Sequence, residues 1–163
     1  MPMNIHELLI PELEHEASLT ETFLKGLPDD KFDWKPHDKS MTLGELANHL
    51  VEVFSWVPAT MDQDVLDMAN YQSPKLASSE ALIKQLHANL PAAIESVKKD
   101  NAVYHEMWKM VNGDTVFMEL PRYTTLRSMV MNQLPHHRAQ LGVYLRLLDI
   151  PVPATYGPSA DAS

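Results

Sequence analysis

The chain has 163 residues, of which 45% are hydrophobic and 21% charged, and its formal net charge is −9. This length suits one domain with a substantial core, and the composition is that of an ordinary globular protein. An acidic surface repels phosphate backbones, which argues against nucleic acid as a partner. The sequence contains no cysteine, which excludes disulfides and thiolate metal sites and fits a cytoplasmic location. No apolar run has the length of a membrane span and the first residues do not resemble a signal peptide, so we expect no membrane partner.

The first predicted helix begins at Asn4, where Glu7 completes a capping-box pattern, and it ends near Gly26. Pro11 fits this helix only if it falls in the first turns. The residues expected to face the core recur at helical spacing: Leu9, Leu13, Ala17, Thr20, Phe23, Leu24 and Leu27. Residues 28–41 contain several Pro, Asp and Lys residues, which predicts a loop.

A second capping box, formed by Thr42 and Glu45, opens a helix that we expect to run to about Val57. Residues 59–70 also favour a helical conformation. The core-facing stripe contains one polar residue, His49, among Leu43, Leu46, Leu50, Val53, Phe54 and Val57. A histidine in such a stripe must satisfy its ring nitrogens without water.

The rest of the chain predicts a crossing connection over residues 70–79 and a third helix from Ser78 or Ser79 to about Lys98. An Asn-Gly turn signal favours a small hairpin near 111–120. A fourth helix extends from Tyr123 or Thr124 to about Leu148, and Pro135 should bend it. Its core-facing stripe also contains a histidine: Leu126, Val130, Leu134, His137, Leu141, Tyr144, Leu145 and Leu148.

Four amphipathic patterns joined by short to moderate connections predict an all-α fold, an up-and-down four-helix bundle. We expect one domain over residues 1–150. The tail, residues 151–163, is rich in Pro, Ala and Ser, which predicts a segment packed on the surface or partly disordered.

His49 and His137 lie on the buried stripes of two different long helices. Either histidine alone would be interpreted as a core residue bonded to a carbonyl and a neighbouring side chain. Two of them in one bundle favour a metal site, because such sites are built from inward side chains on facing helices. Neutral imidazole is a good ligand for zinc, nickel, copper and ferrous iron.

Two imidazoles do not hold a metal well, so a further ligand is expected. Gln133 lies four residues before His137 and therefore one turn away on the same side; it serves either as a weak ligand or as a hydrogen-bond partner. Glu16 on the first helix is a remoter candidate. His136 points about 100° away from His137 and is expected to support the site or an interface. Arg138 is either a surface group or a binder of an anionic substrate.

Three segments together resemble the DinB/YfiT-like family of metalloenzymes. They are residues 42–50 (TLGELANHL), 136–146 (HHRAQLGVYLR) and 156–161 (YGPSAD). The similarity extends over nearly the whole chain with the segments in the family's order and spacing. The resemblance implies a four-helix bundle, which agrees with the helical patterns, and a dimer.

The resemblance also implies a divalent metal held by three histidines, one on the second helix and two spaced four apart on the last. The first matches His49 and the last matches His137, whereas the remaining position holds Gln133. This departure implies a zinc, nickel or iron site that is weakened, differently ligated or empty. Some relatives are thiol-dependent transferases or isomerases, and many have no known activity.

Two functions follow as hypotheses. The first is a metal-dependent transferase or hydrolase, thiol-dependent in one version, which acts on a small-molecule substrate through a metal at His49 and His137. The alternative is a metal-free bundle with a degenerate site that acts as a stress-response binding or dimerisation module. Gln133 is the feature that favours the alternative.

Overall fold

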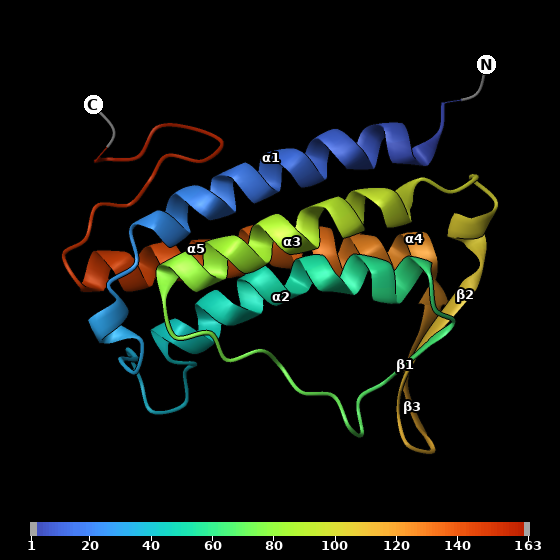
Figure 1. Cartoon of the computed structure of the whole chain (residues 1–163), viewed down its shortest axis with the longest axis horizontal. Helices are drawn as coiled ribbons and strands as arrows, with labels where there is room; N and C mark the ends of the chain where they lie inside the picture. The colour runs from blue at the N-terminus through green and yellow to red at the C-terminus, as the bar shows by residue number, and fades with distance from the viewer. Residues whose placement is uncertain (1–2, 162–163) are drawn as a thin grey trace.

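The computed structural model describes residues 3–161 and shows a helical bundle with a small sheet at one end (Figure 1). The predicted all-α bundle is confirmed. Helix α3 packs against α1 and α2, and α2 also packs against α5. The long helices are α1 (Ile5–Lys25), α2 (Leu43–Met61), α3 (Ser79–Val97) and α5 (Gln133–Leu147).

The capping residues expected from the sequence mark the helix starts. At α2, the Oγ1 atom of Thr42 accepts the amide of Glu45 at 3.1 Å, and the Glu45 carboxylate accepts the amide of Thr42 at 2.8 Å. At α3, the Ser78 hydroxyl accepts the amide of Ala81 at 3.2 Å. These contacts satisfy amide groups that have no partner within the helix.

The apolar stripe of α2 forms the centre of the core, and its members Leu46, Leu50, Val53 and Phe54 are at most 1% exposed. Burial of one such side chain contributes roughly 1.5–3 kcal/mol to stability. The stripe therefore fixes the rotation of α2 about its axis, and with it the direction in which the polar residues of this helix point.

The sheet contains β1 (Val65–Asp67), β2 (Met107–Asn112) and β3 (Thr115–Pro121) in that order. The predicted hairpin is confirmed: β2 and β3 are antiparallel, and Gly113 takes a positive φ of 56° in the turn between them. The prediction of helix over residues 59–70 is wrong beyond Met61. There the chain forms β1, which pairs in parallel with β2. Local periodicity could not predict this strand, because its pairing partner lies far away in the sequence.

The last helical segment, residues 122–147, is interrupted by a π-helical turn, so the prediction of one long bent helix is corrected. It begins as α4 (Arg122–Thr125), continues as the π-helical segment Leu126–Met131, and resumes as α5. The amide of Asn132 bonds to the carbonyl of Arg127 at 2.9 Å, an i to i−5 bond. Pro135 consequently lies in the first turn of α5, where an amide has no intrahelical partner to lose.

Residues 148–161 lead away from α5 and run beside α1 and α5 (Figure 1). Asp161 forms an ion pair with Arg146 at 2.5 Å. The last two residues of the predicted tail, 162 and 163, lie outside the described residues. Within residues 3–161, no helix combines the length and apolar character needed to cross a membrane.

Candidate metal centre

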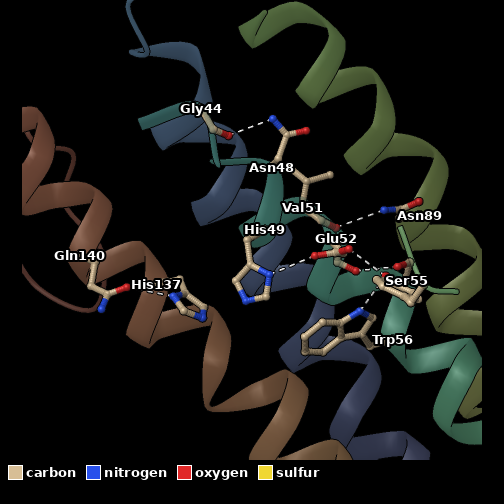
Figure 2. Close-up of polar contacts among 11 residues, drawn as sticks. Gly44, Asn48, His49, Val51, Glu52, Ser55, Trp56, Asn89, His137 and Gln140 are labelled. Carbon is tan, nitrogen blue, oxygen red and sulfur yellow. Dashed lines mark hydrogen bonds and ion pairs between the residues drawn. The ribbon is translucent and has the colours of Figure 1, made fainter. Parts of the chain in front are cut away.

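The rings of His49 on α2 and His137 on α5 meet between the two helices, as the sequence predicted for their stripes (Figure 2). Their centroids are 4.5 Å apart and the ring planes make an angle of 78°. Both side chains are largely but not fully buried, with exposed fractions of 19% for the His49 side chain and 8% for His137. The pair is therefore accessible to a small ion or molecule.

A buried carboxylate orients the His49 ring. The Nδ1 atom of His49 lies 3.0 Å from Oε2 of Glu52, three residues further along α2. Residues three apart lie on the same side of a helix, so the contact requires no distortion. Because the carboxylate can only accept a hydrogen bond, the neutral form of the ring carries its proton on Nδ1 and leaves the lone pair on Nε2.

The Glu52 side chain is only 2% exposed, and further hydrogen bonds hold it in place. Tyr71 donates its hydroxyl to Oε1 of Glu52 at 2.8 Å, and the Trp56 indole N–H donates to the Tyr71 oxygen at 3.1 Å. Burial raises the pKa of Glu52, but hydrogen bonds from His49, Tyr71 and Ser73 outweigh it and lower this pKa below its ordinary value. The carboxylate beneath His49 is therefore charged.

The His137 ring has a matching partner on α5. Its Nδ1 atom lies 2.9 Å from Oε1 of Gln140, again three residues further along the helix (Figure 2). Burial lowers the pKa of His137, the hydrogen bond to Gln140 opposes this shift, and the nearby His49 and His136 rings add to it. His137 is consequently neutral near pH 7 and able to act as a metal ligand.

Two of the remaining residues predicted for the site, His136 and Gln133, make other contacts. His136 is exposed, and its ring centroid is 4.8 Å from that of His137. Gln133 is half-buried, and its amide nitrogen donates to the carbonyl of Ser128 at 3.5 Å. Across the described chain, no cluster of three or more His, Cys, Asp or Glu side chains is arranged to hold a metal. The residues therefore fit a site with two imidazole ligands and do not form the three-histidine site that the resemblance implies.

Arg138 and Glu16 form a buried ion pair with each other. The guanidinium of Arg138, 1% exposed, donates to the Glu16 carboxylate at 2.5 Å and to the hydroxyl of Tyr156 in the tail at 2.5 Å. The same hydroxyl donates to the other oxygen of Glu16 at 2.6 Å. Arg138 and Glu16 are thus bonded to each other and to Tyr156.

Sequence reasoning missed Glu52 and Tyr71 as parts of this site. A signal for Glu52 was present, because an acceptor follows each histidine at the same spacing of three residues: Glu52 after His49 and Gln140 after His137. Tyr71 gives no such signal. It comes from the connection between β1 and α3, and only the folded chain brings it to α2.

The fold and the paired imidazoles define a four-helix-bundle protein with a candidate metal centre between two helices. The sequence profile of the DinB family matches residues 1–163, and the chain belongs to this family. It is also 24% identical over 148 residues to "Uncharacterized protein YrdA" from Bacillus subtilis (strain 168), covering 91% of this chain and 86% of that protein.

Two crystal structures show the same fold. A DinB-like protein from Bacillus cereus ATCC 10987 superimposes with a TM-score of 0.72 at 19% identity, over 96% of this chain and 100% of the other. The DinB-like protein YjoA from Bacillus subtilis gives a TM-score of 0.66 at 14% identity, over 94% of this chain and 97% of the other. At these identities the likeness concerns the fold alone.

Proposed function

We propose that the protein binds a divalent metal ion, namely zinc, nickel or iron, through the Nε2 atoms of His49 and His137. One observation carries the proposal: each ring is anchored at Nδ1 by its own acceptor, Glu52 or Gln140. Metal-binding histidines characteristically use the second ring nitrogen in this way, which fixes the tautomer and raises the basicity of the ligating nitrogen. Among residues 3–161, no hydrogen bond engages Nε2 of either ring.

Two protein ligands leave coordination positions free for water or substrate. A metal bound there would act as a Lewis acid that stabilises the anion of a thiol or of water. The roles of the chain's own residues follow from their contacts. Glu52 holds the His49 ring in one orientation and places a negative charge next to it. Gln140 also holds the His137 ring in one orientation, but its amide is neutral. We propose that the reaction is a transfer or hydrolysis on a small molecule, in a protein that functions as a homodimer.

One specific observation favours the alternative, a metal-free module for binding or dimerisation in a stress response. The side chain at the position where the resemblance implies a third histidine is Gln133, and its amide is bonded to the carbonyl of Ser128. An amide oxygen is a weaker metal ligand than an imidazole nitrogen. The two hypotheses therefore differ in one measurable property, the metal content of the purified protein.

Elemental analysis of protein purified without a histidine tag tests the proposal. We expect zinc, nickel or iron to co-purify with the wild type, and that metal to be lost in His49→Ala and His137→Ala. His105→Ala is the matched control, since His105 is exposed and lies in the 3₁₀ turn Val103–His105, away from the pair. Wild-type protein that contains no metal, and whose melting temperature does not change on addition of zinc or nickel, supports the metal-free alternative instead.

A further inference from the structure

A pocket of about 610 Å³ opens on the side of α2 that carries His49 and Glu52. One part of its wall comes from residues 32–42, including Phe32 and Met41, and another from residues 73–77 of the connection between β1 and α3. This connection runs along α2 in Figure 1. The volume is in the range that proteins use to enclose small organic molecules.

Both walls are tied to α2 by hydrogen bonds, so the pocket is preformed. The Asn48 side-chain amide forms two hydrogen bonds with the backbone of Leu76. It donates to the Leu76 carbonyl at 2.9 Å and accepts from the Leu76 N–H at 2.8 Å. On the other wall, the amide of Gly44 donates to the carbonyl of Phe32 at 2.9 Å. A Cβ atom at position 44 would lie 3.0 Å from the Phe32 ring, so the glycine permits this close approach.

The charged groups that line the pocket are unbalanced. Three are carboxylates, on Asp33, Glu45 and Glu52, and one is the ammonium of Lys75. Between Met3 and Asp161, neither Asp33 nor Lys75 takes part in an ion pair. The remainder of the lining is largely apolar. A partly enclosed surface with net negative charge attracts cations, because its low-dielectric walls concentrate the field.

We propose that this pocket binds a small organic cation: an ammonium group carried on an apolar body. The apolar body would lie against Phe32, Met41 and Leu76, and the ammonium would face Asp33 and Glu45. The inference goes beyond metal binding and does not depend on it, since the pocket and its charges are formed by the chain itself. His49 and Glu52 line the pocket and also belong to the candidate metal centre, so a bound ligand would lie beside that centre.

Three matched probes separate charge from shape: 2-phenylethylamine, 2-phenylethanol and phenylacetate. Each is titrated into EDTA-treated full-length protein, and amide chemical shifts are followed by NMR. We expect the amine to shift the amides of residues 42–49 and 73–77, with a Kd about 5-fold or more below that of phenylacetate. The alcohol should fall between the two.

Substitutions in the pocket sharpen the test. Asp33→Asn should raise the Kd of the amine by about 2- to 5-fold and Lys75→Gln should lower it, while the alcohol responds to neither. Ala77→Trp should fill the pocket and abolish binding. Ala69→Trp is its control, because Ala69 is exposed in the same connection and does not line the pocket.

The proposal is overturned if phenylacetate binds as tightly as the amine, if no probe binds, or if the shifted amides lie elsewhere. Equal loss of binding in Ala69→Trp and Ala77→Trp would also overturn it. Metal content is measured on the same preparation before EDTA treatment. Failure of ligand binding in a protein that retains metal therefore refutes the pocket proposal alone.

Discussion

His49 and His137 meet edge to face at a centroid distance of 4.5 Å, and each ring is fixed at Nδ1 by a residue three positions later in its own helix. Both histidines thus have a hydrogen-bond acceptor at the same spacing in their own helix. The acceptor is the carboxylate of Glu52 for His49 and the amide of Gln140 for His137. This difference has a consequence: the α2 half carries a buried negative charge, whereas the α5 half is neutral.

The first prediction concerns that charge. Glu52→Gln keeps the shape and an acceptor oxygen near His49 but removes the carboxylate, which should lower the basicity of the ligating Nε2. We expect zinc affinity to fall by roughly 10- to 100-fold, the range seen when the outer partners of metal ligands are altered. Competition with a chromophoric chelator measures it. Glu95→Gln, at an exposed carboxylate that forms an ion pair with Lys98, is the control. Unchanged affinity in Glu52→Gln would show that this carboxylate does not act on the metal.

The second prediction concerns pH. The folded-state pKa of His137 lies below its ordinary value of 6.5, chiefly because of burial. The unfolded chain therefore binds more protons than the folded chain between these two pKa values, and stability must fall as pH decreases from about 6.5 through that window. We expect urea unfolding of EDTA-treated protein to show this decline.

His137→Gln provides the comparison for the pH experiment, because it removes the titrating group and retains a polar side chain. Its free energy of unfolding should depend less on pH between about 7 and 5.5 than that of the wild type, whatever its absolute stability. Parallel pH profiles for the two proteins would mean that the protonation of His137 is not linked to folding.

The helices, their caps and the hairpin could be predicted because each has a local signature. The capping box of Thr42 and Glu45 and the apolar stripe containing His49 depend on residues a few positions apart. The same stripes indicated that His49 and His137 point inward, and the structure brings these two rings together.

Two of the features that were missed depend on contacts between distant segments. Strand β1 exists because Val65 pairs with Lys109, and Tyr71 reaches Glu52 only because its connection crosses α2. The π-helical segment before α5, which leaves Pro135 in the first turn of that helix, was missed for a different reason. Apolar spacing indicates that a helix is present, but it does not distinguish i to i−5 bonding from i to i−4 bonding over one turn.

The third prediction concerns position 133. Gln133→His places an imidazole four residues before His137, at the position where the resemblance implies a third ligand. If this side chain leaves the Ser128 carbonyl and turns towards the pair, zinc affinity should rise by at least about 10-fold, since each added imidazole ligand contributes directly to binding. Chelator competition again gives the affinity. His105→Asn, a change at an exposed histidine of the 3₁₀ turn Val103–His105, is the control. Unaltered affinity would show that position 133 does not face the metal.

The last prediction separates Arg138 from the site. Its guanidinium is buried and paired with Glu16 and Tyr156, so Arg138→Met should leave the Glu16 carboxylate buried without its partner. Loss of one member of a buried pair costs about 3–5 kcal/mol. The free energy of unfolding in urea should fall by this amount, and the double variant Glu16→Gln/Arg138→Met should recover part of it. Zinc affinity, measured where the variant is folded, should stay within about 2-fold of the wild type. A large drop in affinity with little change in stability would instead place Arg138 in the function of the site, as the sequence alone had allowed.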